Sequence, residues 1–209
     1  MTHCFSRRSF LKGSAAAAAV LSSPLLPADA AFSETENGLF SPVSALCQTQ
    51  YGPVRGREGE NGLLCWYGIP YGAAPTGESR WTALQDPACW LTVRDCTSPA
   101  PAAYQYTTFP LGTEDCLTLD IYSSAEAKKR PVLVYLHGSA ATGSSLELPG
   151  CELVRDAGCV FVALNYRLGL FGWNCLPTLT ADPDATGNFA LLDIARALDW
   201  VRDNIRRFG

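Results

Sequence analysis

The stretch from residue 132 to residue 169 decides the fold of this chain. It begins with Val132-Leu133-Val134-Tyr135-Leu136-His137-Gly138 and ends with Cys159-Val160-Phe161-Val162-Ala163-Leu164-Asn165-Tyr166-Arg167-Leu168-Gly169. The apolar runs 132–136 and 159–164 contain no alternating polar residues, which is typical of strands buried on both faces in a parallel sheet. Residues 150–157 between them are predicted to form a helix, so the stretch predicts a β-α-β unit and an α/β fold.

Upstream of this unit the sequence predicts further extended segments. Residues 117–122 alternate apolar and polar side chains, the pattern of a strand with one buried face. Three short pieces separated by turn residues predict a small antiparallel meander: 45–49, 53–57 and 63–67. Residues 68–109 are rich in Pro, Gly and aromatic residues without periodicity, so we expect loops there.

The last predicted element is a helix over residues 189–208, where apolar residues recur with a 3.6-residue period. Arg206 and Arg207 suit the negative end of the helix dipole. Gly209 lies where a C-cap glycine is expected, so we expect the chain to end as this helix ends.

The first thirty residues have the pattern of an export signal. Residues 6–12 carry the twin arginines Arg7 and Arg8, an apolar run follows, and residues 28–30 supply a small-residue cleavage site. The apolar run is shorter than the roughly 20 residues that a membrane span needs, so no stable membrane anchor is expected. We therefore predict a twin-arginine signal at 1–30, a leader at 31–44, and a periplasmic or extracellular protein.

Composition excludes several classes of partner and cofactor. Without residues 1–30 the chain has 13 basic and 19 acidic residues, a formal charge of −6, which repels nucleic acid and anionic membranes. Eight cysteines remain without C-x-x-C spacing, and His137 is the one remaining histidine, so no metal site is predicted. Some of these cysteines are expected to be small buried hydrophobes.

Six motifs in order along residues 45–209 resemble the N-terminal part of the type B carboxylesterases, the cholinesterase-like branch of the α/β hydrolases. They are Tyr51-Gly52-Pro53-Val54-Arg55-Gly56, Gly68-Ile69-Pro70-Tyr71 with Arg80-Trp81, Glu114-Asp115-Cys116-Leu117, His137-Gly138, Asn165-Tyr166-Arg167-Leu168-Gly169, and Gly187-Asn188 with the run from Trp200 to Gly209. The resemblance implies an incomplete α/β-hydrolase fold over 45–209, in which an antiparallel meander leads into a parallel sheet with flanking helices.

The resemblance implies hydrolysis of a small-molecule carboxylic ester by a serine nucleophile, a histidine base and an acid, without a cofactor. No G-x-S-x-G turn is present; Gly77-Glu78-Ser79 and Gly143-Ser144-Ser145 are the near matches. We therefore expect the three catalytic residues to lie beyond Gly209. The chain alone is expected to be inactive, and a complementary C-terminal fragment would be its partner.

By the same resemblance, the backbone N–H groups of Ser139 and Ala140 form the oxyanion hole, and His137 and Gly138 are its loop scaffold. Family members usually have glycines at the two donor positions. Because other residues seldom adopt a positive φ, two alternatives stay open: Ser139 and Ala140 form a working oxyanion hole, or they tilt or crowd its donors.

The resemblance also implies structural pairs. Arg80 is expected to pair with Glu114, and Arg167 with Asp193. The family commonly links the cysteine at position 116 to an earlier cysteine whose place Ala103 occupies here, so Cys96 is the nearest candidate partner of Cys116.

Two other functions were weighed against an exported esterase. A non-catalytic esterase-like binding module, or the relic of a split gene, is the alternative that stays open. A cofactor-bearing redox protein is disfavoured, because the sequence has no G-x-G-x-x-G, no C-x-x-C and no histidine cluster. In the family, the strand that leads to the nucleophile lies beside residues 132–136, so an open edge and poor solubility are expected for residues 31–209 alone.

Overall fold

The computed structural model describes residues 44–126, 129–148, 150–174, 176 and 187–209. All of them belong to the unit Pro42–Gly209. The predicted signal and all of the predicted leader except Ser44 lie outside the described residues.

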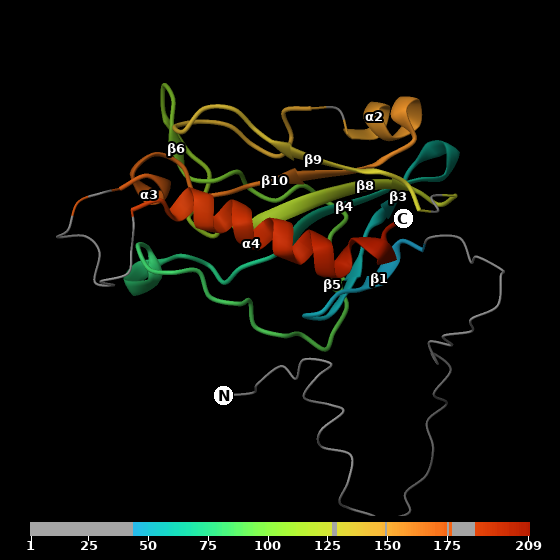
Figure 1. Cartoon of the computed structure of the whole chain (residues 1–209), viewed down its shortest axis with the longest axis horizontal. Coiled ribbons are helices and arrows are strands. Elements are labelled where there is room, and N and C mark those ends of the chain that lie inside the picture. Colours follow the sequence, from blue (N-terminus) through green and yellow to red (C-terminus); the bar gives the residue numbers. More distant parts are fainter. Residues whose placement is uncertain (1–43, 127–128, 149, 175, 177–186) are drawn as a thin grey trace, which may run out of the picture. The chain divides into compact units, whose positions relative to one another are not determined.

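A five-stranded mixed sheet forms the centre of this unit (Figure 1). In spatial order its strands are β3 (Arg57–Glu58), β4 (Leu63–Pro70), β8 (Thr118–Ser124), β10 (Val160–Leu164) and β9 (Val132–Leu136). β9 and β10 are parallel, and the other pairings are antiparallel. The predicted β-α-β unit is present, but the expected parallel sheet is limited to this pair. In β10 the continuous apolar run does correspond to burial on both faces, although one of its two neighbours, β8, is antiparallel.

The antiparallel pairings of the predicted meander are present, but they are divided between two sheets: Arg57, the last residue of the second predicted piece, begins β3, which pairs antiparallel with β4. β1 (Leu46–Gln48) and β2 (Pro53–Arg55) pair antiparallel as expected, and the other neighbour of β2 is β5 (Arg94–Asp95). β4 lies in the central sheet instead, because Trp66 and Ile69 are wholly buried there in the main core. The remaining short elements are η1 (Glu60–Gly62), η2 (Gly77–Ser79), β6 (Gln105–Tyr106), β7 (Pro110–Leu111), α3 (Gly169–Gly172) and η3 (Ile205–Arg207).

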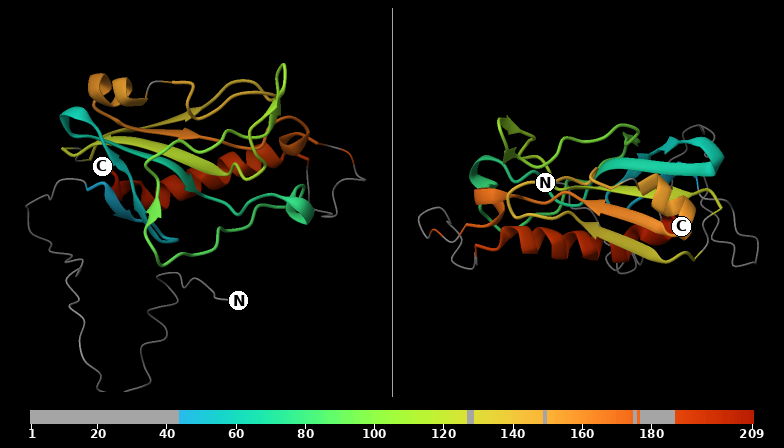
Figure 2. Two further views of the ribbon diagram at one scale, coloured as in Figure 1. Left: turned by 180° about the vertical axis from the view of Figure 1, so that it is seen from behind. Right: turned by 90° about the horizontal axis from the view of Figure 1, so that it is seen from above.

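Two longer helices cover opposite faces of the central sheet, as Figures 1 and 2 show. α2 (Gly150–Ala157) lies on one face with the bounds that the sequence predicts. α4 (Phe189–Asn204) lies on the other face, starts at the predicted residue and continues into η3. Trp200 and Val201, on the apolar face of α4, pack in the main core.

Side chains of each central strand alternate between these two faces. In β10, Val162 packs in the cluster that contains α4, and Phe161 packs in the cluster that contains α2. The prediction that residues 117–122 bury a single face is wrong, because α2 covers the second face. Asp120, on the polar side of that pattern, is only 1% exposed.

β9 forms one edge of the central sheet within the described part of the chain. Its position is as predicted, but burial on both faces is not observed. Val132, Leu133 and Leu136 are 40%, 46% and 44% exposed. The strand has a covered edge along β10 and, among the described residues, an open edge on its other side.

Candidate oxyanion-binding turn and its supports

The backbone turns sharply after β9, at residues 137–143. Ser139 has a φ of +67°, in the left-handed region that favours glycine. Its Oγ accepts hydrogen bonds from the backbone N–H groups of Ala141 (3.1 Å) and Thr142 (3.3 Å). These bonds offset part of a backbone strain of about 1–2 kcal/mol. Ser139 therefore adopts a backbone conformation that residues other than glycine seldom adopt.

The backbone N–H groups of Ser139 and Ala140 are not used by any acceptor in the described part of the chain. Both residues are exposed, and neither N–H donates a hydrogen bond to a described residue. The carbonyl of Ala140 accepts a hydrogen bond from the N–H of Gly169 (2.8 Å), which ties the turn to the segment after β10. The turn thus presents two adjacent, unpaired N–H donors, which is the chemistry that a developing oxyanion needs.

His137 lies at the start of this turn and packs against its buried side. Its ring is 3% exposed and stacks on Tyr166, with the ring centroids 4.3 Å apart. The Tyr166 hydroxyl donates a hydrogen bond to the His137 carbonyl (2.6 Å). Burial lowers the pKa of His137, although the Gly138 carbonyl beside its Nδ1 opposes that shift. A carbonyl only accepts hydrogen bonds, so Nδ1 carries the proton, and the buried Nε2 has no partner among the described residues.

A buried polar network lies next to the turn, and the sequence motifs did not indicate it. Ser145 donates its hydroxyl hydrogen to Asp120 (2.6 Å) and its backbone N–H to Asn165 (2.9 Å). Asp120 also accepts the N–H of Gly68 (2.7 Å). Burial raises the pKa of Asp120, and these two donors oppose the rise. The available signal was an aspartate between two apolar residues of a strand, Leu119 and Ile121.

The structure brings both predicted ion pairs together and joins them to each other. Arg167 contacts Asp193 through two nitrogens, at 2.6 and 2.8 Å, with side chains 2% and 0% exposed. Burial raises the pKa of Asp193, and the guanidinium of Arg167 opposes the rise. Arg80 holds Glu114 at 2.5 and 2.8 Å. Arg167 also donates to the carbonyl of Arg80 (3.0 Å), a link that the sequence did not indicate.

The suggested bridge between Cys96 and Cys116 is not present. Both are free, buried thiols that pack as small apolar groups in the main core. Burial raises the pKa of Cys96 to about 11 and that of Cys116 to about 12. Cys89, by contrast, is disulfide-bonded.

The described residues contain no group of three or more His, Cys, Asp or Glu side chains that could hold a metal ion. None of their helices is long and apolar enough to cross a membrane.

Comparisons with known proteins identify the N-terminal signal. Residues 4–23 match the twin-arginine translocation pathway signal sequence. The chain is therefore exported by this route to the periplasm or the extracellular space.

Most of the chain is similar to esterases of several organisms. It is 39% identical over 173 residues to para-nitrobenzyl esterase of Bacillus subtilis (strain 168), covering 77% of this chain and 35% of that protein. Carboxylesterase 3B of Mus musculus is 37% identical over 185 residues, covering 77% and 32%. Fumonisin B1 esterase of Sphingopyxis macrogoltabida is 35% identical over 174 residues, covering 77% and 32%.

The solved structures of such esterases share the fold. A PNB esterase superposes with a TM-score of 0.72 at 39% identity, covering 78% of this chain and 35% of that chain. The chain spans about a third of the length of the relatives it matches. The carboxylesterase family model matches residues 43–209, so the chain belongs to the carboxylesterase family.

Proposed function

We propose that this chain supplies the oxyanion-binding part of an exported serine carboxylesterase. The observation that carries the proposal is the pair of N–H groups on Ser139 and Ala140, which have no hydrogen-bond partner among the described residues and lie on an exposed turn at the carboxyl end of β9. In a tetrahedral intermediate the former carbonyl oxygen of the ester is negative. Backbone donors already aimed at that oxygen stabilise it, and each is worth about 3–4 kcal/mol.

His137 has the role of a support rather than of a general base. Its Nδ1 is held against the Gly138 carbonyl, and its ring is stacked beneath the turn on Tyr166. A base must reach the proton of the nucleophile within about 3 Å. The Nε2 of His137 is buried and has no hydrogen-bond partner among the described residues. We therefore propose that the serine, the catalytic histidine and the acid come from a complementary segment, and that this chain alone is inactive.

The open edge of β9 supports a complementary segment as the partner. An additional strand would satisfy that edge and cover Leu133 and Leu136. Leu191 and Leu198 of α4 are 52% and 45% exposed, which leaves further apolar surface for the same partner to cover. We further propose that residues 1–30 are the export signal and that residues 31–44 are a leader between the signal and the folded part.

A chimera tests the proposed function. Residues 43–209 would replace the matching part of the Bacillus subtilis para-nitrobenzyl esterase, and turnover of a chromogenic short-chain ester would be measured. We expect activity in the chimera and none from residues 31–209 alone. Within the chimera, Ala140→Pro removes one N–H donor and should lower kcat by about 100- to 1000-fold. Ala140→Gly keeps the donor and is the matched control.

The chimera also tests the competing function. A folded chimera without turnover, or one in which Ala140→Pro and Ala140→Gly behave alike, would contradict the oxyanion role. That result would favour a non-catalytic esterase-like module or the relic of a split gene.

A further inference from the structure

The second apolar cluster, between α2 and the sheet, contains two thiols in contact. Cys65 lies on β4 and Cys151 in the first turn of α2, and their Sγ atoms are 3.8 Å apart. Of the free thiols in the described part of the chain, only these two lie in hydrogen-bonding contact with each other. The contact joins elements that are 86 residues apart in the sequence.

The pair combines a protected sulfur with a reachable one. Cys65 is 4% exposed, whereas Cys151 is only partly buried. Burial and the adjacent Cys151 raise the pKa of Cys65 to about 12. A disulfide reagent would therefore meet Cys151 first, and Cys65 would react only from within the protein.

The destination of the protein also favours oxidation of this pair. The twin-arginine signal sends the chain out of the cytoplasm, where thiols stay reduced, to a compartment where disulfides persist. We infer that Cys65 and Cys151 form a disulfide after export, which fastens α2 to β4. The sulfur atoms have to approach by about 1.8 Å to reach bonding distance.

The oxidation is a thiol–disulfide exchange with an external disulfide RSSR, either a small molecule or an oxidised dithiol protein. The Cys151 thiolate attacks one sulfur of RSSR, which breaks the S–S bond and releases the first RS⁻. The Cys65 thiolate then attacks the Cys151 sulfur of this mixed disulfide and releases the second RS⁻. The two thiol protons end on two RSH molecules, so two electrons pass from the cysteines to RSSR.

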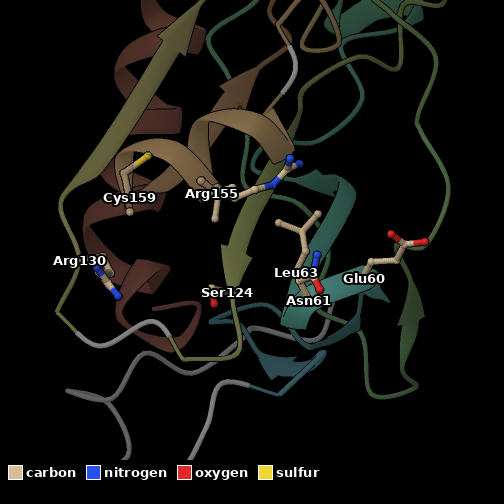
Figure 3. Close-up of a pocket in the computed structure, with 9 residues that line it drawn as sticks. Glu60, Asn61, Leu63, Ser124, Arg130, Arg155 and Cys159 are labelled. Carbon is tan, nitrogen blue, oxygen red and sulfur yellow. The ribbon is translucent and has the colours of Figure 1, made fainter.

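The bond would lie near a cavity. A cavity of about 490 Å³ opens beside the C-terminal half of α2. Figure 3 shows Arg155 extending from α2 over Leu63 of β4, with Ser124 and Cys159 around the same space. Cys151 lies one helical turn before Arg155, so the bridge would hold the end of α2 that is closer to the turn at residues 137–143.

Peptide mapping of the full chain, recovered after export, tests the inference without any substitution. Free thiols are alkylated in denaturant, the protein is digested without reduction, and disulfide-linked peptides are identified by mass. We expect a Cys65–Cys151 peptide in the exported protein and alkylated Cys65 and Cys151 in cytoplasmic precursor. Cys96 and Cys116 should be alkylated in both samples and serve as internal controls.

A stability measurement provides the second readout. Reduction with dithiothreitol should lower the unfolding midpoint of the exported wild type by more than it lowers that of Cys151→Ala, because the disulfide of Cys89 is reduced in both proteins. Cys116→Ala should retain the effect of reduction. Full alkylation of Cys65 and Cys151 in the exported protein, or a bridge from Cys151 to Cys159 instead, would overturn the inference. Neither readout depends on ester turnover, so it fails or succeeds independently of the proposed function.

Discussion

Gly143 lies directly against the imidazole of His137, so closely that a Cβ atom at Gly143 would stand 2.2 Å from Nδ1. Gly143 also has a φ of +140°, a conformation that other residues rarely adopt. The ring cannot move aside without disturbing its neighbours, because it is buried and stacked on Tyr166. The turn at residues 137–143 is therefore closed by contact between a glycine and a histidine six residues apart.

Gly143→Ala is expected to destabilise the protein by about 1–3 kcal/mol, because both the backbone and His137 must shift. Chemical denaturation would measure the change. Gly138→Ala is the matched control, since a Cβ there meets nothing within 4 Å. Equal losses in the two variants would contradict the role of the contact.

Ser139→Ala and Ser139→Gly separate the strain of Ser139 from its hydrogen bonds. The alanine variant keeps the left-handed conformation but loses the Oγ acceptor, so we expect a loss of about 1 kcal/mol. The glycine variant loses the same acceptor but relieves the strain, so its stability should stay close to that of the wild type. Differential scanning calorimetry of the three proteins would show the order. A glycine variant less stable than the alanine variant would refute this account.

Arg167→Ala should cost about 3–5 kcal/mol, because it leaves Asp193 buried without its partner. Arg202→Ala is the control, since Arg202 pairs with Asp199 at the surface and is 67% exposed. The unfolding midpoint should fall clearly for the first variant and hardly move for the second. An unchanged midpoint in Arg167→Ala would remove this pair from the supports of the fold.

Stability should fall as the pH is lowered below about 6.5, the usual pKa of histidine. Because burial lowers the pKa of His137 in the folded chain, the unfolded chain takes up the proton first. The contribution is fully present above about pH 6.5 and is lost as the pH falls through the pKa of the folded state. Urea midpoints from pH 8 to pH 5 would measure it. His137→Gln should weaken this pH dependence, and identical slopes in the two proteins would contradict the assignment.

Residues 31–209 alone should self-associate, because the open edge of β9 can pair with another chain. Leu133→Lys places a charge on that edge and should reduce association in analytical ultracentrifugation. Arg155→Lys leaves the edge unchanged and is the control. A wild-type protein that is monomeric and melts sharply would contradict the expectation.

The sequence predicts best those elements that are determined by neighbouring residues in the chain. The bounds of α2, the start of α4 and the position of β9 follow from periodicity and apolar runs that a few consecutive residues determine. The direction of β8 beside β10 and the burial of Asp120 depend on residues far away in the chain. Periodicity could not reveal them.

The candidate site divides in the same way. Motif resemblance indicated Ser139, Ala140 and both ion pairs. It did not indicate that the Oγ of Ser139 accepts two backbone N–H groups, because that depends on a φ angle. The pairing suggested for Cys96 and Cys116 was wrong because motif spacing carries no information on how two side chains pack.

Tyr166 and Arg167 are consecutive, and they face different parts of the molecule. Tyr166 holds His137 under the turn, while Arg167 is fastened to Asp193 in α4. One peptide bond thus joins the support of the turn to the anchor of a helix on the far side of the sheet. An engineered substitution in α4 that displaces Asp193 is therefore expected to shift the support of the turn as well, although it alters no residue of the turn.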